Sequence, residues 1–192
     1  SLSQEFLREK QSDSSVSLRD VHRFINFFKF FSFFFPDNFN TCISLVTAIS
    51  YFLRLDSRQN KKALEVHLNK ELGDKKIDFL AELERFLDDL SKDLLSLGVL
   101  PDDICLNMPL KENLFACWAC LMTKTPLIIC GKPGTSKTLT IGIISDAFNL
   151  SKAASQNSKY FKYCLMLVRR DVWGNLNTTS KSIEEQFVKT KE

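Results

Sequence analysis

Residues 126–138, with the sequence PLIICGKPGTSKT, constrain the fold of this chain more than any other feature. They read as a short apolar run, a tight turn of Gly and Pro, and a Lys-Thr pair that opens a helix. This is the layout of a phosphate-binding loop, whose pattern is G-x-x-x-x-G-K-[ST]. Ser136 stands where the second glycine of the pattern is expected. The segment therefore predicts a strand–loop–helix unit that binds a nucleoside triphosphate with magnesium.

The residue types of the loop suit a polyphosphate, which needs several converging N–H donors of the kind that a Gly-rich turn and a helix N-terminus supply. Gly131 ends the strand sharply, and Gly134 lets the main chain approach the phosphates without a Cβ in the way. Lys137 is expected to bind the β- and γ-phosphates, and Thr138 to bind the magnesium. The predicted ligands are ATP and Mg²⁺, and the predicted binding residues are Gly131, Lys132, Pro133, Gly134, Thr135, Ser136, Lys137 and Thr138.

The flanking sequence agrees with this interpretation. Residues 127–130 are apolar, as expected for a buried parallel strand, and an apolar helical pattern runs from Lys137 to about Asn149. Two consequences of Ser136 remain open: its hydroxymethyl group is accommodated at the helix start, or it crowds the phosphate and weakens binding. A chance turn between a strand and a helix is the alternative to a phosphate loop, and the Lys-Thr pair argues against it.

Composition excludes several classes of protein. The net charge of +3 is too small to argue for nucleic acid or an anionic membrane. The phenylalanine-rich stretch of residues 24–35 contains Asn26 and Lys29 and is shorter than the roughly 20 apolar residues of a membrane span, so we expect buried helices and no transmembrane segment. Six scattered cysteines and no visible secretory signal suit a reducing, cytoplasmic setting.

The pattern along the chain predicts two regions that meet near residue 98. Residues 1–16 are a polar lead-in, and Ser17 and Asp20 form a capping box that opens a helix to about Phe35. Further helices are expected at about 40–55, 59–72, 77–97, 110–124 and 180–188, and a second strand at 160–168. The predicted fold class is α/β with an all-helical N-terminal half.

Other candidate sites in the sequence are weaker. Residues 86–89 (FLDD) match the pattern of a strand end that binds magnesium, but they lie in an amphipathic helical pattern before the loop. Asp171 also follows an apolar run, but that run comes too soon after the loop to carry the magnesium-binding acid of an ATPase. Cys117 and Cys120 form a C-x-x-C within an apolar helical run without a second ligand pair, which predicts a buried helix face rather than a zinc site. No catalytic residue is predicted.

Several segments together resemble the mysterin family of giant, dynein-like AAA+ proteins that are also ubiquitin ligases. The loop 131–138 is similar to that family's loop, which likewise has Ser in place of the second Gly. Residues 107–115 (NMPLKENLF) are similar to the family's N-x-x-L-[KR]-E-N-L-F helix. Residues 17–23, 51–55 and 178–187 also resemble family segments, whereas residues 169–174 depart from the family's pattern.

By this resemblance, residues 17–98 are the lid helices of a preceding AAA+ module, and residues 99–192 are the first part of the next α/β nucleotide-binding domain. Arg19 matches a lid arginine that approaches the nucleotide of its own module, with a surface helix charge as the alternative. The implied function is ATP binding within a multi-module AAA+ ATPase coupled to ubiquitin ligase activity. The implied partners are nucleotide, neighbouring AAA+ modules of the same polypeptide and a ubiquitin-conjugating enzyme.

Two other functions are compatible with the same residues. One is a different P-loop enzyme, such as a small kinase or GTPase with a helical extension, and the other is a non-enzymatic helical scaffold with a vestigial loop. The chain begins with Ser1 and ends soon after the loop, so we expect it to be part of a larger protein. Because no Walker-B acid, arginine finger or RING-type cluster is recognisable, we expect the chain alone to hydrolyse no ATP.

Overall fold

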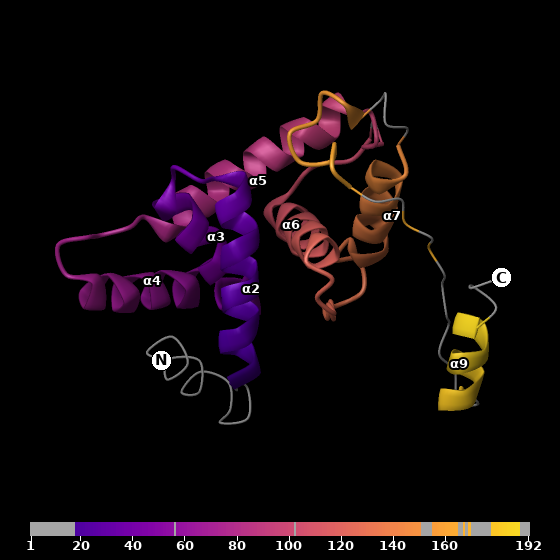
Figure 1. The fold of residues 1–192 in the computed structure, drawn as a ribbon, viewed down its shortest axis with the longest axis horizontal. Helices are drawn as coiled ribbons and strands as arrows, with labels where there is room; N and C mark the ends of the chain where they lie inside the picture. Colours follow the sequence, from indigo (N-terminus) through magenta and orange to yellow (C-terminus); the bar gives the residue numbers. More distant parts are fainter. Residues whose placement is uncertain are drawn as a thin grey trace.

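The computed structural model describes residues 18–55, 57–101, 103–150, 155–164, 167, 169 and 178–188, and within them the chain forms helices and turns but no strand. The helices are arranged as Figure 1 shows. Their bounds are α2 Leu18–Phe34, α3 Phe39–Ser50, the 3₁₀ turn η2 Phe52–Arg54, α4 Arg58–Leu72, α5 Phe79–Ser96, α6 Met108–Met122, α7 Lys137–Phe148 and α9 Ser180–Val188.

Local capping chemistry sets several of these helix ends, and the end of α4 at Gly73 is the one that the sequence predicted. The Asn107 side chain accepts a hydrogen bond from the Leu110 N–H at 3.0 Å and thereby starts α6. Gly73 ends α4 with a φ of 60°, an angle that glycine adopts without steric cost. Ser17 of the predicted capping box lies outside the described residues. The buried carboxylate of Asp20 lies 3.3 Å from the guanidinium of Arg54.

The helix expected over residues 40–55 ends earlier than predicted, at Ser50. Tyr51 leaves the helical region with a φ of −134°, and the chain continues as the 3₁₀ turn η2. The turn carries Phe52 fully into the core, where its ring packs edge-on against Phe79 of α5 with 6.1 Å between centroids. Burial of this ring therefore outweighs continuation of the helix.

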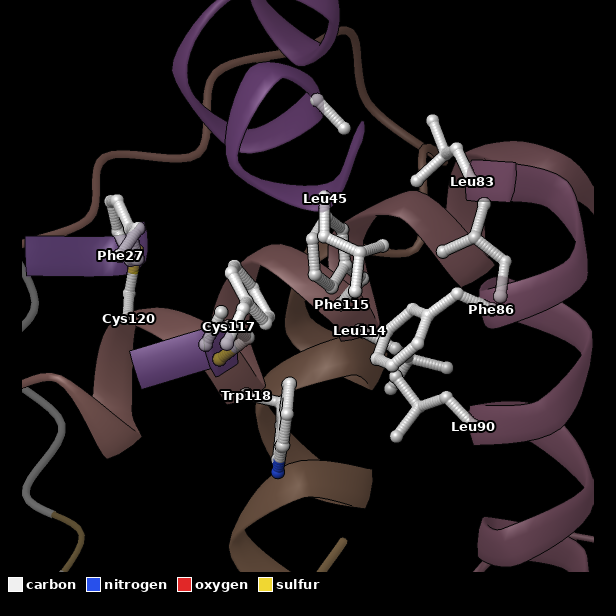
Figure 2. Close-up of a cluster of buried hydrophobic side chains, with 14 of the residues drawn as sticks. Phe27, Leu45, Leu83, Phe86, Leu90, Leu114, Phe115, Cys117, Trp118 and Cys120 are labelled. Carbon is white, nitrogen blue, oxygen red and sulfur yellow. The ribbon is translucent and has the colours of Figure 1, made fainter. Parts of the chain in front are cut away.

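An aromatic cluster around Trp118 of α6 joins the two regions of the chain. The Trp118 side chain is fully buried, and its Nε1 donates a hydrogen bond to the Tyr160 carbonyl at 3.3 Å. Ring centroids lie 5.4–6.3 Å from that of Trp118 for Phe30, Phe31, Phe34, Phe86 and Tyr160. Aromatic pairs at such separations stabilise a core beyond the area they bury. Figure 2 shows Phe86 and Leu90 of α5 facing α6 across this core.

The phenylalanine-rich stretch of residues 24–35 is thus largely part of a helical core, as predicted, although Phe33 keeps 72% of its surface exposed. None of the described helices combines the length and the apolar character that a membrane crossing requires.

Neither predicted strand is formed within the residues that the structure describes. Residues 127–130 run without strand pairing, and Ile128 is 86% exposed where a buried strand was expected. A strand is defined by hydrogen bonds to a neighbour, and the described residues supply no neighbouring strand. In the second predicted strand, residues 160–163 form turns, whereas residues 165, 166 and 168 lie outside the described part of the chain.

The turn at residues 158–161 has a clear physical cause. Asp93 of α5 accepts hydrogen bonds from the Ser158 hydroxyl at 2.7 Å and from the N–H groups of Lys159 and Tyr160 at 3.2 and 3.0 Å. Backbone donors that a strand would use for its ladder are therefore bound to a helix side chain. The Tyr160 hydroxyl also donates to Asp89 at 2.6 Å, which fixes this segment against α5.

Candidate nucleotide-binding site

The predicted phosphate loop forms a tight turn into the N-terminus of α7, which begins at Lys137 as expected. Gly134 has a φ of 81°, and Ser136 is left-handed with φ 56° and ψ 20°. A Cβ on Gly131 would lie only 2.8 Å from the Thr135 Oγ1, so the turn closes too tightly there for a side chain. The loop thus uses glycine at Gly131 and Gly134 and strains a non-glycine residue at Ser136.

The side chain of Lys137 folds back across this turn. Its Nζ donates to the carbonyls of Gly131 and Lys132 at 2.9 and 2.7 Å, and to the Thr135 Oγ1 at 3.0 Å. The Thr135 hydroxyl in turn donates to the Lys132 carbonyl at 2.8 Å. An ammonium has three donors, so all three are accounted for by the loop itself. The positive charge consequently lies at the centre of the turn.

The loop borders a hollow of about 620 Å³, within the size range of small-molecule sites. Most of the residues predicted from the sequence line it. The lining consists of Gly131, Pro133, Gly134, Thr135, Ser136, Lys137, Thr138 and Leu139. Lys132 is the predicted residue that does not line the hollow, and it contributes its carbonyl to Lys137 instead. Thr138 is exposed in the first turn of α7, where a hydroxyl can reach a bound cation.

Two residues that the sequence analysis did not select hold the loop from outside. The Asn113 side chain of α6 donates from Nδ2 to the Thr135 carbonyl at 3.3 Å. Thr140, which is fully buried, donates from both its N–H and its hydroxyl to the Ser136 carbonyl, at 2.9 and 2.8 Å. Asn113 lies inside the family-like segment 107–115, and that position was the available signal for its role.

The other candidate sites have structural surroundings. Cys117 and Cys120 lie on a buried face of α6, as predicted, and Figure 2 shows them among the core side chains. Burial raises the pKa of both thiols to about 11. Within the described residues, no group of three or more His, Cys, Asp or Glu side chains is arranged to hold a metal. The FLDD run lies in α5 as expected, with Asp88 bound to Lys111 at 2.6 Å. Asp171 lies outside the described residues.

Arg19 does not line this hollow and is exposed on α2. Arg169 is also exposed and lines a mainly apolar groove between α6 and α7, which shares Lys137 and Thr138 with the hollow beside the loop.

Comparison with known proteins supplies the family. A family model described as the RNF213 AAA domain matches residues 103–192. The chain is 31% identical over 160 residues to the E3 ubiquitin-protein ligase rnf213-beta of Danio rerio, and 31% identical over 170 residues to the E3 ubiquitin-protein ligase RNF213 of Homo sapiens. Each alignment covers 76% of this chain and 3% of the relative. No solved structure matches the chain.

The family match includes the predicted phosphate loop. It begins at Asp103, between α5 and α6, and contains all of residues 131–138. The alignments to the relatives extend over more of the chain than the family model, although the chain spans only about 3% of the relatives' length. Residues 103–192 therefore match the RNF213 AAA domain family, and the chain is similar to RNF213 ubiquitin-protein ligases along 76% of its own length.

Proposed function

We propose that residues 131–138 bind ATP with Mg²⁺, and that the chain is a nucleotide-binding segment of a multi-module AAA+ ATPase. The observation that carries the proposal is the tight turn at the N-terminus of α7 with the Lys137 ammonium at its centre. The N-terminus of α7 favours an anion at this place. The family match supports the same function, since AAA domains are nucleotide-binding domains.

The residues have separate roles in this proposal. Lys137 exchanges its bonds to the carbonyls of Gly131 and Lys132 for oxygens of the phosphate chain. Gly134 allows the main chain to approach the ligand closely. Thr138 contributes its hydroxyl to Mg²⁺, which neutralises charge on the phosphates.

We further propose that residues 17–98 are the lid helices of a preceding module and that residues 99–192 begin an α/β core. Exposed apolar side chains support the second part of this division, because Leu127 and Ile128 are 38% and 86% exposed. Leu127 borders the groove of about 640 Å³ that lies between residues 125–129, α6 and α7. Strands from the rest of the protein would cover such a surface.

In the full-length protein, we propose that nucleotide binding is coupled to ubiquitin transfer, with a ubiquitin-conjugating enzyme and the neighbouring AAA+ modules as partners. The relatives' names as E3 ubiquitin-protein ligases support this coupling. Free thiols, among them the buried Cys42, Cys117 and Cys120, support a reducing, cytoplasmic setting. Because no acid is positioned for hydrolysis among the described loop residues, the chain alone is expected to bind ATP without turning it over.

A titration with a fluorescent ATP analogue and Mg²⁺ tests the proposal. Lys137→Ala removes the central charge and is expected to weaken binding at least tenfold, as charge-assisted hydrogen bonds are worth about 1.5–3 kcal/mol. Lys62→Ala is the matched control, since it removes one positive charge from the exposed face of α4 away from the hollow, and it should bind within about twofold of the wild type. Equal affinity of the wild type and Lys137→Ala would mean that the loop is vestigial.

A further inference from the structure

Three successive side chains of α6 each contact a different part of the molecule. Lys111 Nζ lies 2.6 Å from Asp88 Oδ1 of α5, and Glu112 Oε1 lies 2.5 Å from Lys61 Nζ of α4. Asn113 Nδ2 lies 3.3 Å from the Thr135 carbonyl of the phosphate loop. Successive residues of a helix point about 100° apart, so one turn of α6 contacts three neighbours at once.

The contact made by Asn113 determines the orientation of a peptide group in the loop. The carbonyls of Gly131 and Lys132 are bound by Lys137, and the Ser136 carbonyl is bound within α7 by Thr140. The Thr135 carbonyl, in contrast, is held by a side chain from another helix. Asn113 is therefore the external support of the loop at this carbonyl.

This orientation matters for an anion. In a planar trans peptide, the carbonyl of one residue and the N–H of the next point to opposite sides. Holding the Thr135 carbonyl toward α6 therefore directs the Ser136 N–H away from α6. Ser136 itself lines the hollow beside the loop. If the same peptide were reversed, a carbonyl oxygen would face the place where an anion binds, and the two would repel each other.

The support is itself anchored to the helical region. The pair between Glu112 and Lys61 is largely buried, with 21% and 13% of the two side chains exposed. Adjacent to it on α6, Lys111 binds Asp88 of α5. The turn of α6 that carries Asn113 is thus bound to both α4 and α5, and the pair with Lys61 remains when the contact of Lys111 is removed.

We propose that Asn113 is a positioning residue of the phosphate loop, which turns the Thr135–Ser136 peptide so that the Ser136 N–H faces the bound anion. The inference rests on the proposed function of residues 131–138 and adds a residue from outside the motif to that site. It also connects the loop to the helices that precede it, because the turn of α6 that carries Asn113 is bound to α4 and α5.

The test compares two variants of the 192-residue chain. Asn113→Asp keeps the shape of the side chain but removes its N–H donor. Lys111→Met removes the neighbouring contact to α5 and leaves the contact to the loop in place. The readouts are the NMR order parameters of the Thr135 and Ser136 amides without nucleotide, the affinity for ATP with Mg²⁺, and the midpoint of urea unfolding.

Asn113→Asp is expected to lower the two order parameters from rigid values to below about 0.6 and to weaken ATP binding about fivefold, since one hydrogen bond contributes about 1 kcal/mol. Lys111→Met is expected to lower the unfolding midpoint while both loop readouts stay at wild-type values. This separation distinguishes positioning of the loop from docking of the helix.

Unchanged order parameters in Asn113→Asp would overturn the inference, and so would equal loop disorder in both variants or disorder without any loss of ATP affinity. If the wild type itself bound no ATP, the proposed function would fail. The order parameters would then decide the inference by themselves, because they report how firmly the peptide is held without any ligand.

Discussion

Replacing Ser136 with glycine tests whether the left-handed turn before α7 is strained. Ser136 has φ 56° and ψ 20°, and it makes no side-chain capping hydrogen bond that would compensate for this conformation. A left-handed residue with a Cβ costs about 1–2 kcal/mol, and glycine removes that cost. Glycine also loses more backbone freedom on folding, and this entropy loss offsets about 0.5–1 kcal/mol of the stabilisation. Ser136→Gly should therefore stabilise the chain by about 0.5–1 kcal/mol.

For a protein of this size, that gain corresponds to a rise of about 1–4 °C in the melting temperature. Urea unfolding followed by circular dichroism measures it directly. Ser145→Gly is the matched control, because Ser145 lies inside α7. The same substitution there should destabilise the chain by about 0.5 kcal/mol, since glycine is a poorer helix former than serine.

Destabilisation by Ser136→Gly to the same extent as by Ser145→Gly would refute the reasoning, as it would mean that no left-handed strain exists at Ser136. The affinity of the variant for ATP answers a separate question. Strain that is present with and without ligand does not change affinity. A change within about twofold therefore indicates that the hydroxymethyl group is accommodated, and a large gain in affinity indicates that it crowds the phosphate.

Three further predictions concern the core and the thiols. Tyr160→Phe removes the 2.6 Å hydrogen bond to Asp89 while keeping the ring, and it should lower the free energy of unfolding by about 1 kcal/mol; a double-mutant cycle with Asp89→Asn that gives no coupling would contradict this. Partial burial opposes ionisation of Asp89, but hydrogen bonds from Lys159 and Tyr160 hold its pKa below the ordinary value. Because the pKa is lowered in the folded state, this carboxylate should stabilise the chain above about pH 4 and lose that effect as the pH falls further. The free energy of unfolding of Asp89→Asn, measured in urea, should therefore fall less steeply with decreasing pH than that of the wild type. Among the six free thiols, the exposed Cys105 and Cys130 should react first with a thiol reagent at pH 8, and labelling of the buried core thiols before unfolding would argue against the packing around α6.

Much of the helical structure could be predicted from the sequence because its signals are local. The Asn107 side chain caps α6 by binding the N–H of a residue three positions later in the chain, and Gly73 ends α4 by adopting a positive φ. The turn at Gly131 and Gly134, followed by a helix at Lys137, was predicted in the same way. Such preferences act over one turn of chain and need no knowledge of the rest of the fold.

The incorrect predictions involve partners that are far apart in the sequence. The apolar pattern of residues 160–168 favoured a strand, but Asp93 binds the Tyr160 N–H from 67 residues away and holds that segment in a turn. Apolar character at residues 127–130 likewise predicted a buried strand, and its burial requires neighbouring strands that the described residues do not supply.

The sequence was sufficient for most of the helices, the end of α4 at Gly73, the position of the loop and the family resemblance, because each rests on chemistry between residues close in the chain or on a run of matching residues. Only the tertiary structure decided that Lys137 lies on the carbonyls of its own loop and that Asn113 holds the Thr135 carbonyl from α6. It also placed Trp118 at the centre of the aromatic cluster. These contacts depend on how whole helices pack, and that packing is the sum of many weak interactions that no local pattern records.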